Sequence, residues 1–300
     1  LSSYLEGKIY SHFSTICVIF FIKLKINLST DLKPIRLIIP WQRLIASMVV
    51  DLVFLAKTST SGEWKVVSSA VSTLVEEATF EASLEGITFR AMDPSHVALI
   101  DLSWPKSAFE KYECDKPFKF SIKVEDFMKL IKRADAKDSI EITTADDMLV
   151  LRILDGYKRE FSMHLIESTY GPTPLPKLSF NVKATIAGRA FDKILSDISA
   201  ISDHMTVEAS KDRLVFSGKS DVGSGSVTLE RASQDLLELE VKEDGKATYN
   251  IEYLSKIIRV TSSDTVLLEY SSKMPVRLEL KLSDLGGKIH FYLAPRIEER

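Results

Sequence analysis

The chain has 300 residues, 45% of them hydrophobic and 27% charged, which is the composition of a folded globular protein and excludes a disordered one. Its formal net charge of -3 excludes the large positive total of a strongly basic nucleic-acid-binding protein, so only the distribution of charge could carry that function. The two cysteines, Cys17 and Cys114, do not form a pair with metal-ligand spacing, so we expect no disulfide framework and a reducing cytoplasm.

The first segment of the chain differs in character from the rest. Residues 13–22 (FSTICVIFFI) are almost wholly apolar, but this run is shorter than the roughly 20 residues of a membrane span. No plausible signal-peptide cleavage site follows it. Met48 is followed at once by VVDLVFLA, which is typical of the opening strand of a domain. We therefore expect residues 1–47 to be an extension from a mis-assigned start, with a membrane-touching tail as the alternative.

An internal repeat predicts two copies of one domain. TFEAS at residues 79–83 returns as TVEAS at 206–210, an offset of 206 − 79 = 127 residues. Asp126-Phe127-Met128 matches Glu252-Tyr253-Leu254 at an offset of 252 − 126 = 126, and this second match continues without gaps. Two separate blocks with nearly one offset indicate a duplication. The predicted domains are residues 48–166 and 178–300.

Each copy is predicted to run strand, helix, several strands, helix, several strands. The first helices show apolar residues at helical spacing, namely Trp64, Val67, Val71 and Leu74 in one copy and Phe191, Ile194, Ile198 and Ile201 in the other. Hairpins are expected from Gly86 to Pro105 and from Arg213 to Leu229, the second turning at Asp221-Val222-Gly223. Many hairpins and few helices predict an α+β fold, in which mainly antiparallel sheets carry two helices per domain on one face.

The segment between the copies, residues 167–177 (ESTYGPTPLPK), is predicted to be an extended connector. Its three prolines and one glycine disfavour a helix or a central strand. Prolines also make such a segment semi-rigid. A plain surface linker is an equally good interpretation of this stretch by itself.

Motifs that would carry catalysis or hold a cofactor are not found. The five histidines are dispersed, and there is neither a GxGxxG sequence nor a Walker lysine loop. Gly223-Ser224-Gly225 precedes a strand rather than a helix, so we interpret it as a hairpin turn. Asp93-Pro94-Ser95-His96 contains residue types of a catalytic triad, but four neighbours in a loop are weak evidence for one. The sequence therefore predicts no enzyme, no cofactor and no metal site.

Basic side chains are concentrated on the predicted helices. In the helix expected over Val124–Ala134, apolar residues form one stripe, and Lys129, Lys132 and Arg133 lie off it on a shared solvent face. The other helices carry Lys65, Arg189, Lys193, Lys256 and Arg259. Such a face would attract DNA phosphates without reading bases. The alternative is that these are the ordinary solvated faces of amphipathic helices.

Three segments resemble the proliferating cell nuclear antigen family, the DNA polymerase sliding clamps, in its archaeal form. They are AMDPSHVALIDL (91–102), YECDKPFKFSIKVEDFMKLIKRA (112–134) and FYLAPRIEE (291–299), and the resemblance extends over residues 48–300. It implies a closed ring of three chains with six like domains, whose helices line a hole around duplex DNA. It further implies a cytoplasmic, nucleoid-associated, non-enzymatic processivity factor. Such a clamp tethers DNA polymerase, flap endonuclease, ligase and other clients through a short hydrophobic motif, after an ATP-dependent loader has opened the ring.

The resemblance also implies which residues contact DNA. Lys65, Lys129, Lys132, Lys193 and Arg259 match the family's basic sites or fall within one position of them. Helical spacing adds Arg133, Arg189 and Lys256. The first helix departs from the family pattern, because serines at positions 68, 69 and 72 make it less basic than usual.

A hydrophobic pocket beneath the connector, which binds a short helical plug of client enzymes, is a further implication. The matching residues are Met92, His96, Val97, Pro275, Tyr292, Leu293, Ala294 and Pro295, with Leu175 of the connector as the candidate for the apolar rim. The sequence GPTPLP departs from the family's connector. For Met92 and Leu293, ordinary core packing is the alternative.

Two alternative functions stay open at this point. One is a clamp-shaped subunit of a heterotrimeric or checkpoint-type ring that does not close alone, since the sequence does not separate a homotrimer from a heterotrimer. The other is an enzyme whose site is assembled from scattered residues such as Asp93, His96 and Glu252.

Overall fold

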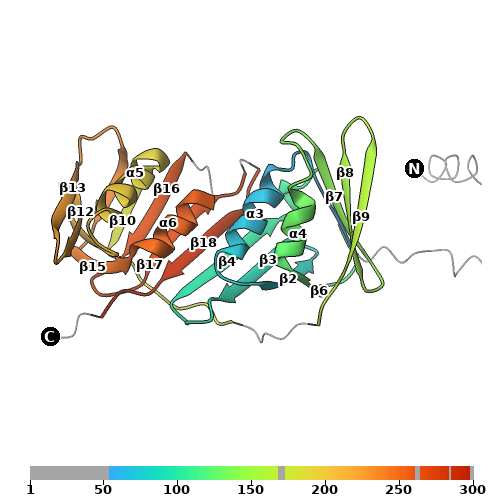
Figure 1. Cartoon of the computed structure of the whole chain (residues 1–300), viewed down its shortest axis with the longest axis horizontal. Helices are drawn as coiled ribbons and strands as arrows, with labels where there is room; N and C mark the ends of the chain where they lie inside the picture. The colour runs from blue at the N-terminus through green and yellow to red at the C-terminus, as the bar shows by residue number, and fades with distance from the viewer. Residues whose placement is uncertain (1–53, 168–172, 261–263, 284, 298–300) are drawn as a thin grey trace, which may run out of the picture. The chain divides into compact units, whose positions relative to one another are not determined.

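The computed structural model describes residues 54–167, 173–260, 264–283 and 285–297 (Figure 1). The predicted extension 1–47 and the expected start of the first strand at Met48 lie outside these residues. Among the described helices, none combines the length and apolar character that crossing a membrane requires.

In the described residues, the first copy contains nine strands, two α-helices and a short 3-10 helix. In chain order they are β1 (Phe54–Thr58), α3 (Gly62–Ser72), β2 (Glu77–Ser83), β3 (Gly86–Met92), β4 (Ala98–Pro105), η1 (Lys106–Ala108), β5 (Lys111–Cys114), β6 (Phe118–Lys123), α4 (Val124–Ile131), β7 (Ser139–Ala145), β8 (Met148–Leu154) and β9 (Lys158–His164).

The second copy repeats this order of helices and strands. It consists of β10 (Val182–Ala187), α5 (Gly188–Ser199), β11 (His204–Ser210), β12 (Arg213–Ser220), β13 (Gly223–Glu230), β14 (Leu236–Val241), β15 (Gly245–Asn250), α6 (Ile251–Val260), β16 (Thr265–Tyr270), β17 (Val276–Lys281) and β18 (Lys288–Leu293). The predicted α+β fold with two helices per copy is confirmed for the described residues.

The strands form three antiparallel sheets, one of which is shared by the two copies. The orders are β5-β1-β7-β8-β9, β13-β12-β11-β15 and β14-β10-β16-β17-β18-β4-β3-β2-β6. In the nine-stranded sheet, β18 pairs with β4 from Lys288 opposite Ser103 to Leu293 opposite Ala98. Backbone hydrogen bonds therefore join the two copies into one continuous sheet.

The four α-helices of the described residues lie along one side of the sheets, in front of the strands in Figure 1. Helix α3 packs against α4, α5 packs against α6, and α3 also contacts α6. The predicted apolar stripes face the core, because Trp64, Val67, Phe191 and Ile194 are all buried. In the first copy, the ring of Trp64 lies 4.7 Å from that of Trp104, which fixes α3 on the sheet.

Helix α4 ends at Ile131, whereas the sequence predicted a helix as far as Ala134. The amides of Arg133 and Ala134 bond the carbonyls of Leu130 and Ile131, three residues back, at 3.0 and 3.1 Å. This tighter hydrogen bonding ends the α-helix in a turn. Ala134 is nevertheless buried as its place in the apolar stripe requires.

The described part of the connector contains neither helix nor strand, as predicted for residues 167–177. Ile166, just before it, makes an isolated bridge to Ser121 of β6. On the far side, the carbonyl of Thr173 accepts a hydrogen bond from Arg90 Nη1 of β3 at 3.4 Å. The residue just before the connector and Thr173 within it therefore both contact strands of the first copy.

Candidate functional site

The eight predicted basic side chains all lie on the four helices or in the turn after α4. Lys129, Arg189, Lys193, Lys256 and Arg259 are exposed on the helices, and Lys132 and Arg133 are exposed in the turn. Lys65 of α3 is half-buried. The fold therefore places the cations on the helix-bearing side of a chain whose net charge is -3.

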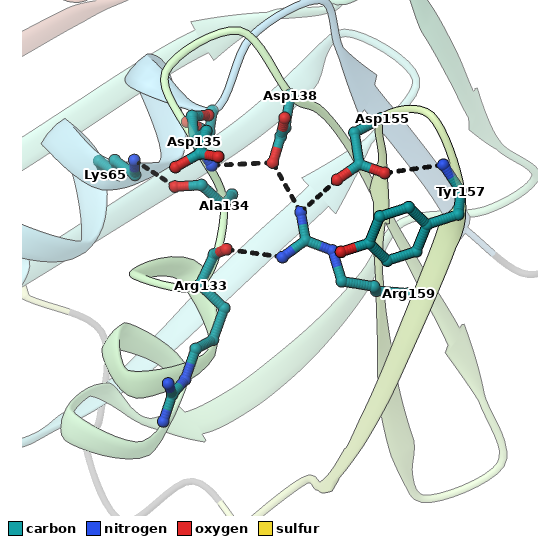
Figure 2. Close-up of polar contacts among 9 residues, drawn as sticks. Lys65, Arg133, Ala134, Asp135, Asp138, Asp155, Tyr157 and Arg159 are labelled. Atoms are coloured by element: carbon teal, nitrogen blue, oxygen red, sulfur yellow. Dashed lines mark hydrogen bonds and ion pairs between the residues drawn. The ribbon is translucent and has the colours of Figure 1, made fainter.

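Three of these cations already have partners within the chain. Lys129 Nζ lies 2.9 Å from Glu125 and 3.1 Å from Asp126, and Lys256 Nζ lies 2.6 Å from Glu252. The hydrogen bond from Lys129 to Glu125 is the largest cause that raises the pKa of Lys129, and the hydrogen bond to Asp126 adds to it. Lys65 Nζ donates to the carbonyl oxygen of Ala134 at 2.6 Å, which joins α3 to the turn after α4 (Figure 2).

The other five cations have no side-chain ion pair or hydrogen bond to another described residue. They are Lys132, Arg133, Arg189, Lys193 and Arg259. A lysine or arginine without an internal carboxylate partner can bond an external phosphate without first breaking an ion pair. Glu125 and Glu252 lie four residues before Lys129 and Lys256, a spacing at which helical ion pairs form, so for these two lysines the signal is present in the sequence.

Arg159 of β9 fixes the turn that carries Lys132 and Arg133. Its guanidinium donates to the carbonyl oxygen of Arg133 at 2.8 Å, to Asp138 Oδ2 at 2.8 Å and to Asp155 Oδ2 at 2.6 Å. The same Asp138 oxygen accepts the amide of Asp135 at 2.8 Å. In Figure 2 the side chain of Arg133 points away from this cluster. The cluster therefore binds the backbone of the turn and leaves the Arg133 guanidinium at the surface.

A groove of about 970 Å³ lies on the first copy, beside the connector. Its lining includes the chain after α3, the outer sides of β2 and β3, and Thr173. Two of the predicted pocket residues, Met92 and His96, line it. His96 has a left-handed backbone with φ of 58°, and its Nδ1 lies 3.2 Å from the sulfur of Met92.

The other seven predicted pocket residues lie outside this lining. Ala294 bonds the carbonyl of Val97 through its amide at 2.9 Å. Tyr292 and Leu293 are buried in β18, and Leu293 belongs to the core. Tyr292 is the cross-strand neighbour of Leu99, which in turn opposes Met92. The remaining three are surface or half-buried positions, namely Leu175, Pro275 and Pro295.

Asp93, which also lines the groove, is buried and its carboxylate accepts four hydrogen bonds. Oδ1 accepts the amides of Val97 and Ala98 at 2.8 and 2.7 Å. Oδ2 accepts the amide of Ser95 at 3.2 Å and the hydroxyl of Tyr253 at 2.8 Å. Burial by itself would raise the pKa of Asp93, but these bonds to the carboxylate outweigh burial and lower it.

The enzyme alternative finds little support in this geometry. Both oxygens of Asp93 are occupied by structural donors, and Glu252 is paired with Lys256. Among the residues that the structure describes, no group of three or more histidine, cysteine or acidic side chains could hold a metal ion.

Comparison with known proteins assigns the family. The model of the N-terminal domain of proliferating cell nuclear antigen matches residues 53–166, and that of the C-terminal domain matches residues 174–296. The chain belongs to the proliferating cell nuclear antigen (PCNA) family. The predicted resemblance and the predicted sliding-clamp fold are thereby confirmed.

Similar PCNA-family proteins come from archaea. The chain is 48% identical to the DNA polymerase sliding clamp of Nitrosopumilus maritimus over 247 residues, which covers 82% of this chain and 99% of that protein. It is also 48% identical to that of Cenarchaeum symbiosum over 246 residues, with 81% and 98% covered. A crystal structure of PCNA from Thermococcus kodakaraensis matches with a TM-score of 0.78 and 26% identity, and the match covers 81% of this chain and 100% of that one. The predicted function, a DNA sliding clamp, is confirmed by these matches.

Two polar groups of this PCNA-family chain were missed by sequence reasoning. The sequence carries no signal for Arg159, because its partners are distant along the chain or lie in turns. Tyr253 stands out in the sequence only as an aligned position of the repeat, although its hydroxyl bonds Asp93 across 160 residues. No spacing pattern signals contacts of this kind.

Replacing Arg159 by lysine is expected to loosen the turn after α4. Lysine lacks the planar fork that lets arginine bond a carbonyl and two carboxylates together. We expect the free energy of unfolding to fall, with faster amide hydrogen exchange at Asp135. The matched control is Arg152→Lys, because Arg152 also bonds two carboxylates, those of Glu141 and Glu160, at 2.8 Å. Equal exchange at Asp135 in both variants would contradict this role.

Proposed function

We propose that this sliding clamp acts as a closed ring of three chains whose helices face duplex DNA. The observation that carries the proposal is the set of five cations without internal partners on the helix-bearing side. Such a surface favours DNA phosphates without sequence preference, so the ring stays mobile along the duplex. The domain limits 48–166 and 178–300, with the connector 167–177 between them, are part of the proposal.

Two edge strands support ring closure. Among the described strands, β9 pairs only with β8, and β13 pairs only with β12. They have seven and eight residues and belong to different copies of the domain. An unpaired edge is a template for another strand. If β9 of one chain pairs with β13 of the next, the contact is head-to-tail, and such a contact gives a ring when the rotation between chains closes and an open filament when it does not.

A mixing experiment with the full chain tests this closure. Phe161→Asp on β9 and Val227→Asp on β13 each place a carboxylate on a half-buried edge position. We expect light scattering to give the mass of three chains for the wild type and of one chain for each variant. An equimolar mixture of the variants is expected to give two chains, because one intact edge of each kind is left in the mixture. Thermal melts show whether each variant is folded.

A ring that needs sister chains predicts a different result in the same experiment. A wild-type chain that stays monomeric at high concentration, or variants that fail to pair when mixed, would refute self-closure and favour a heterotrimeric ring.

We further propose that the groove beside Met92 and His96 takes part in docking DNA polymerase, flap endonuclease, ligase and other clients. Client binding would raise the effective concentration of an enzyme at the primer end. The PCNA family consists of non-catalytic processivity factors, and we propose no chemistry for this chain either. Ring opening would need a separate ATP-driven loader, and the working place would be the cytoplasm at the nucleoid.

A further inference from the structure

We propose that Tyr253 is a positioning residue for the groove. Acting from helix α6 of the second copy, it would fix the turn after β3 through the buried carboxylate of Asp93. The turn presents Met92 and His96 to the groove. This inference rests on the proposed function of the groove as a docking site for clients.

Asp93 links three parts of the fold through one carboxylate. One oxygen binds the amides of Val97 and Ala98, where β4 begins. The other binds the amide of Ser95 and the phenol of Tyr253. Only 4% of the Asp93 surface is exposed, so water cannot readily replace a missing donor. Among the described residues, Tyr253 alone donates a hydrogen bond to this carboxylate from outside its own turn.

The turn depends on such external support because its backbone is unusual. His96 has a φ of 58°, in the left-handed region that residues other than glycine seldom adopt. Conformations of this kind persist where the surroundings fix them. Since His96 and Met92 both line the groove, a turn that relaxes would change the shape of the groove itself.

Helix α6, which carries Tyr253, is held in place by a hydrogen bond in its first turn and by core packing. The amide of Tyr253 donates to Asn250 Oδ1 at 3.2 Å in the first turn of the helix. Leu254 and Ile257 bury the same helix in the core. Two of the predicted DNA-contacting residues, Lys256 and Arg259, are exposed on this helix. The helix that carries them therefore also carries Tyr253, the positioning residue of the groove.

Tyr253→Phe removes the hydroxyl and keeps the ring, so it tests the bond with little change in packing. The turn should then populate more conformations, and the affinity for a docked peptide falls in proportion to the competent fraction. We expect the dissociation constant to rise about three- to tenfold. The probe is a fluorescein-labelled synthetic peptide with aliphatic and aromatic anchors at helical spacing, measured by anisotropy on the full-length protein.

Tyr112→Phe is the matched control. The hydroxyl of Tyr112 donates to the carbonyl of Ser83 at 2.8 Å, the same length as the Tyr253 bond, and Tyr112 does not line the groove. We expect its peptide affinity to equal that of the wild type. Amide exchange at Val97 and Ala98, measured without peptide, is expected to accelerate in Tyr253→Phe alone.

The two readouts separate failure of the inference from failure of the proposed function. If the wild type does not bind the peptide, docking at this groove is refuted, and so is a positioning role toward it. If the wild type binds the peptide and both variants bind it with the wild-type affinity, Tyr253 has no positioning role and the docking proposal stands. Weaker binding without faster exchange at Val97 and Ala98 would also overturn the inference, because the effect would not pass through the turn.

Discussion

Lys132→Gln is expected to weaken the binding of this clamp to duplex DNA more than Lys129→Gln does. Both changes remove one positive charge at the same end of α4, so their long-range electrostatic effects are alike. Lys129 is already bonded to Glu125 and Asp126, whereas Lys132 has no side-chain partner among the described residues. Only the change at Lys132 should therefore remove a direct bond to a phosphate.

The measurement is the salt dependence of binding to a short duplex, followed by fluorescence anisotropy. The slope of log K against log salt changes by about 0.9 for each DNA phosphate that the protein no longer neutralises, and in a ring of three chains one substitution frees up to three phosphates. We expect a less steep slope, flattened in this way, for Lys132→Gln, Lys193→Gln and Arg259→Gln. For Lys129→Gln and Lys256→Gln we expect slopes close to that of the wild type.

The opposite ranking would contradict the division of the cations. If Lys129→Gln flattened the slope as much as Lys132→Gln, the ion pairs of Lys129 would have to open on the DNA. If none of the substitutions changed the slope, the helix-bearing side would not face DNA, and the interpretation of these cations as an ordinary solvated surface would stand.

The duplication and the buried helix faces were predictable from the sequence because both depend on local regularities. Trp64 and Phe191 occupy equivalent places in the repeat, and each is buried as its helical spacing requires. The hairpin from Arg213 onward is likewise local, and its turn falls between β12 and β13 where Asp221 and Val222 were expected.

Contacts between distant segments were not predictable in the same way. Nothing in the spacing of β4 and β18 shows that they pair and thereby join two domains into one sheet. The pairing of Lys129 with Glu125 and Asp126 is by contrast local, because these acids lie four and three residues before it on α4. The Asp93–Tyr253 bond depends on how the two copies are packed, which no periodicity within either copy encodes.

The hairpin between β2 and β3 is expected to be highly sensitive at Gly86. This glycine has a φ of +140°, and a Cβ there would lie 2.2 Å from the carbonyl oxygen of Trp104 and 2.8 Å from Pro105 Cα. Both are backbone atoms of the neighbouring strand β4, so no side-chain rotation relieves the clash. Gly86→Ala should therefore strain its own backbone and push β3 from β4.

We expect Gly86→Ala to lower the free energy of unfolding by about 2–6 kcal/mol, the combined range for one strained backbone conformation and for overpacking. Gly156→Ala is the control, because its Cβ would meet no atom within 4 Å. Its effect should stay within about 0.5 kcal/mol. Urea unfolding monitored by circular dichroism gives both values, provided that the m-value is unchanged. If Gly86→Ala lowered the free energy of unfolding as little as Gly156→Ala does, the prediction would be wrong. It would mean that β3 and β4, which carry Met92 and the pairing with β18, can move apart at Gly86 with almost no loss of stability.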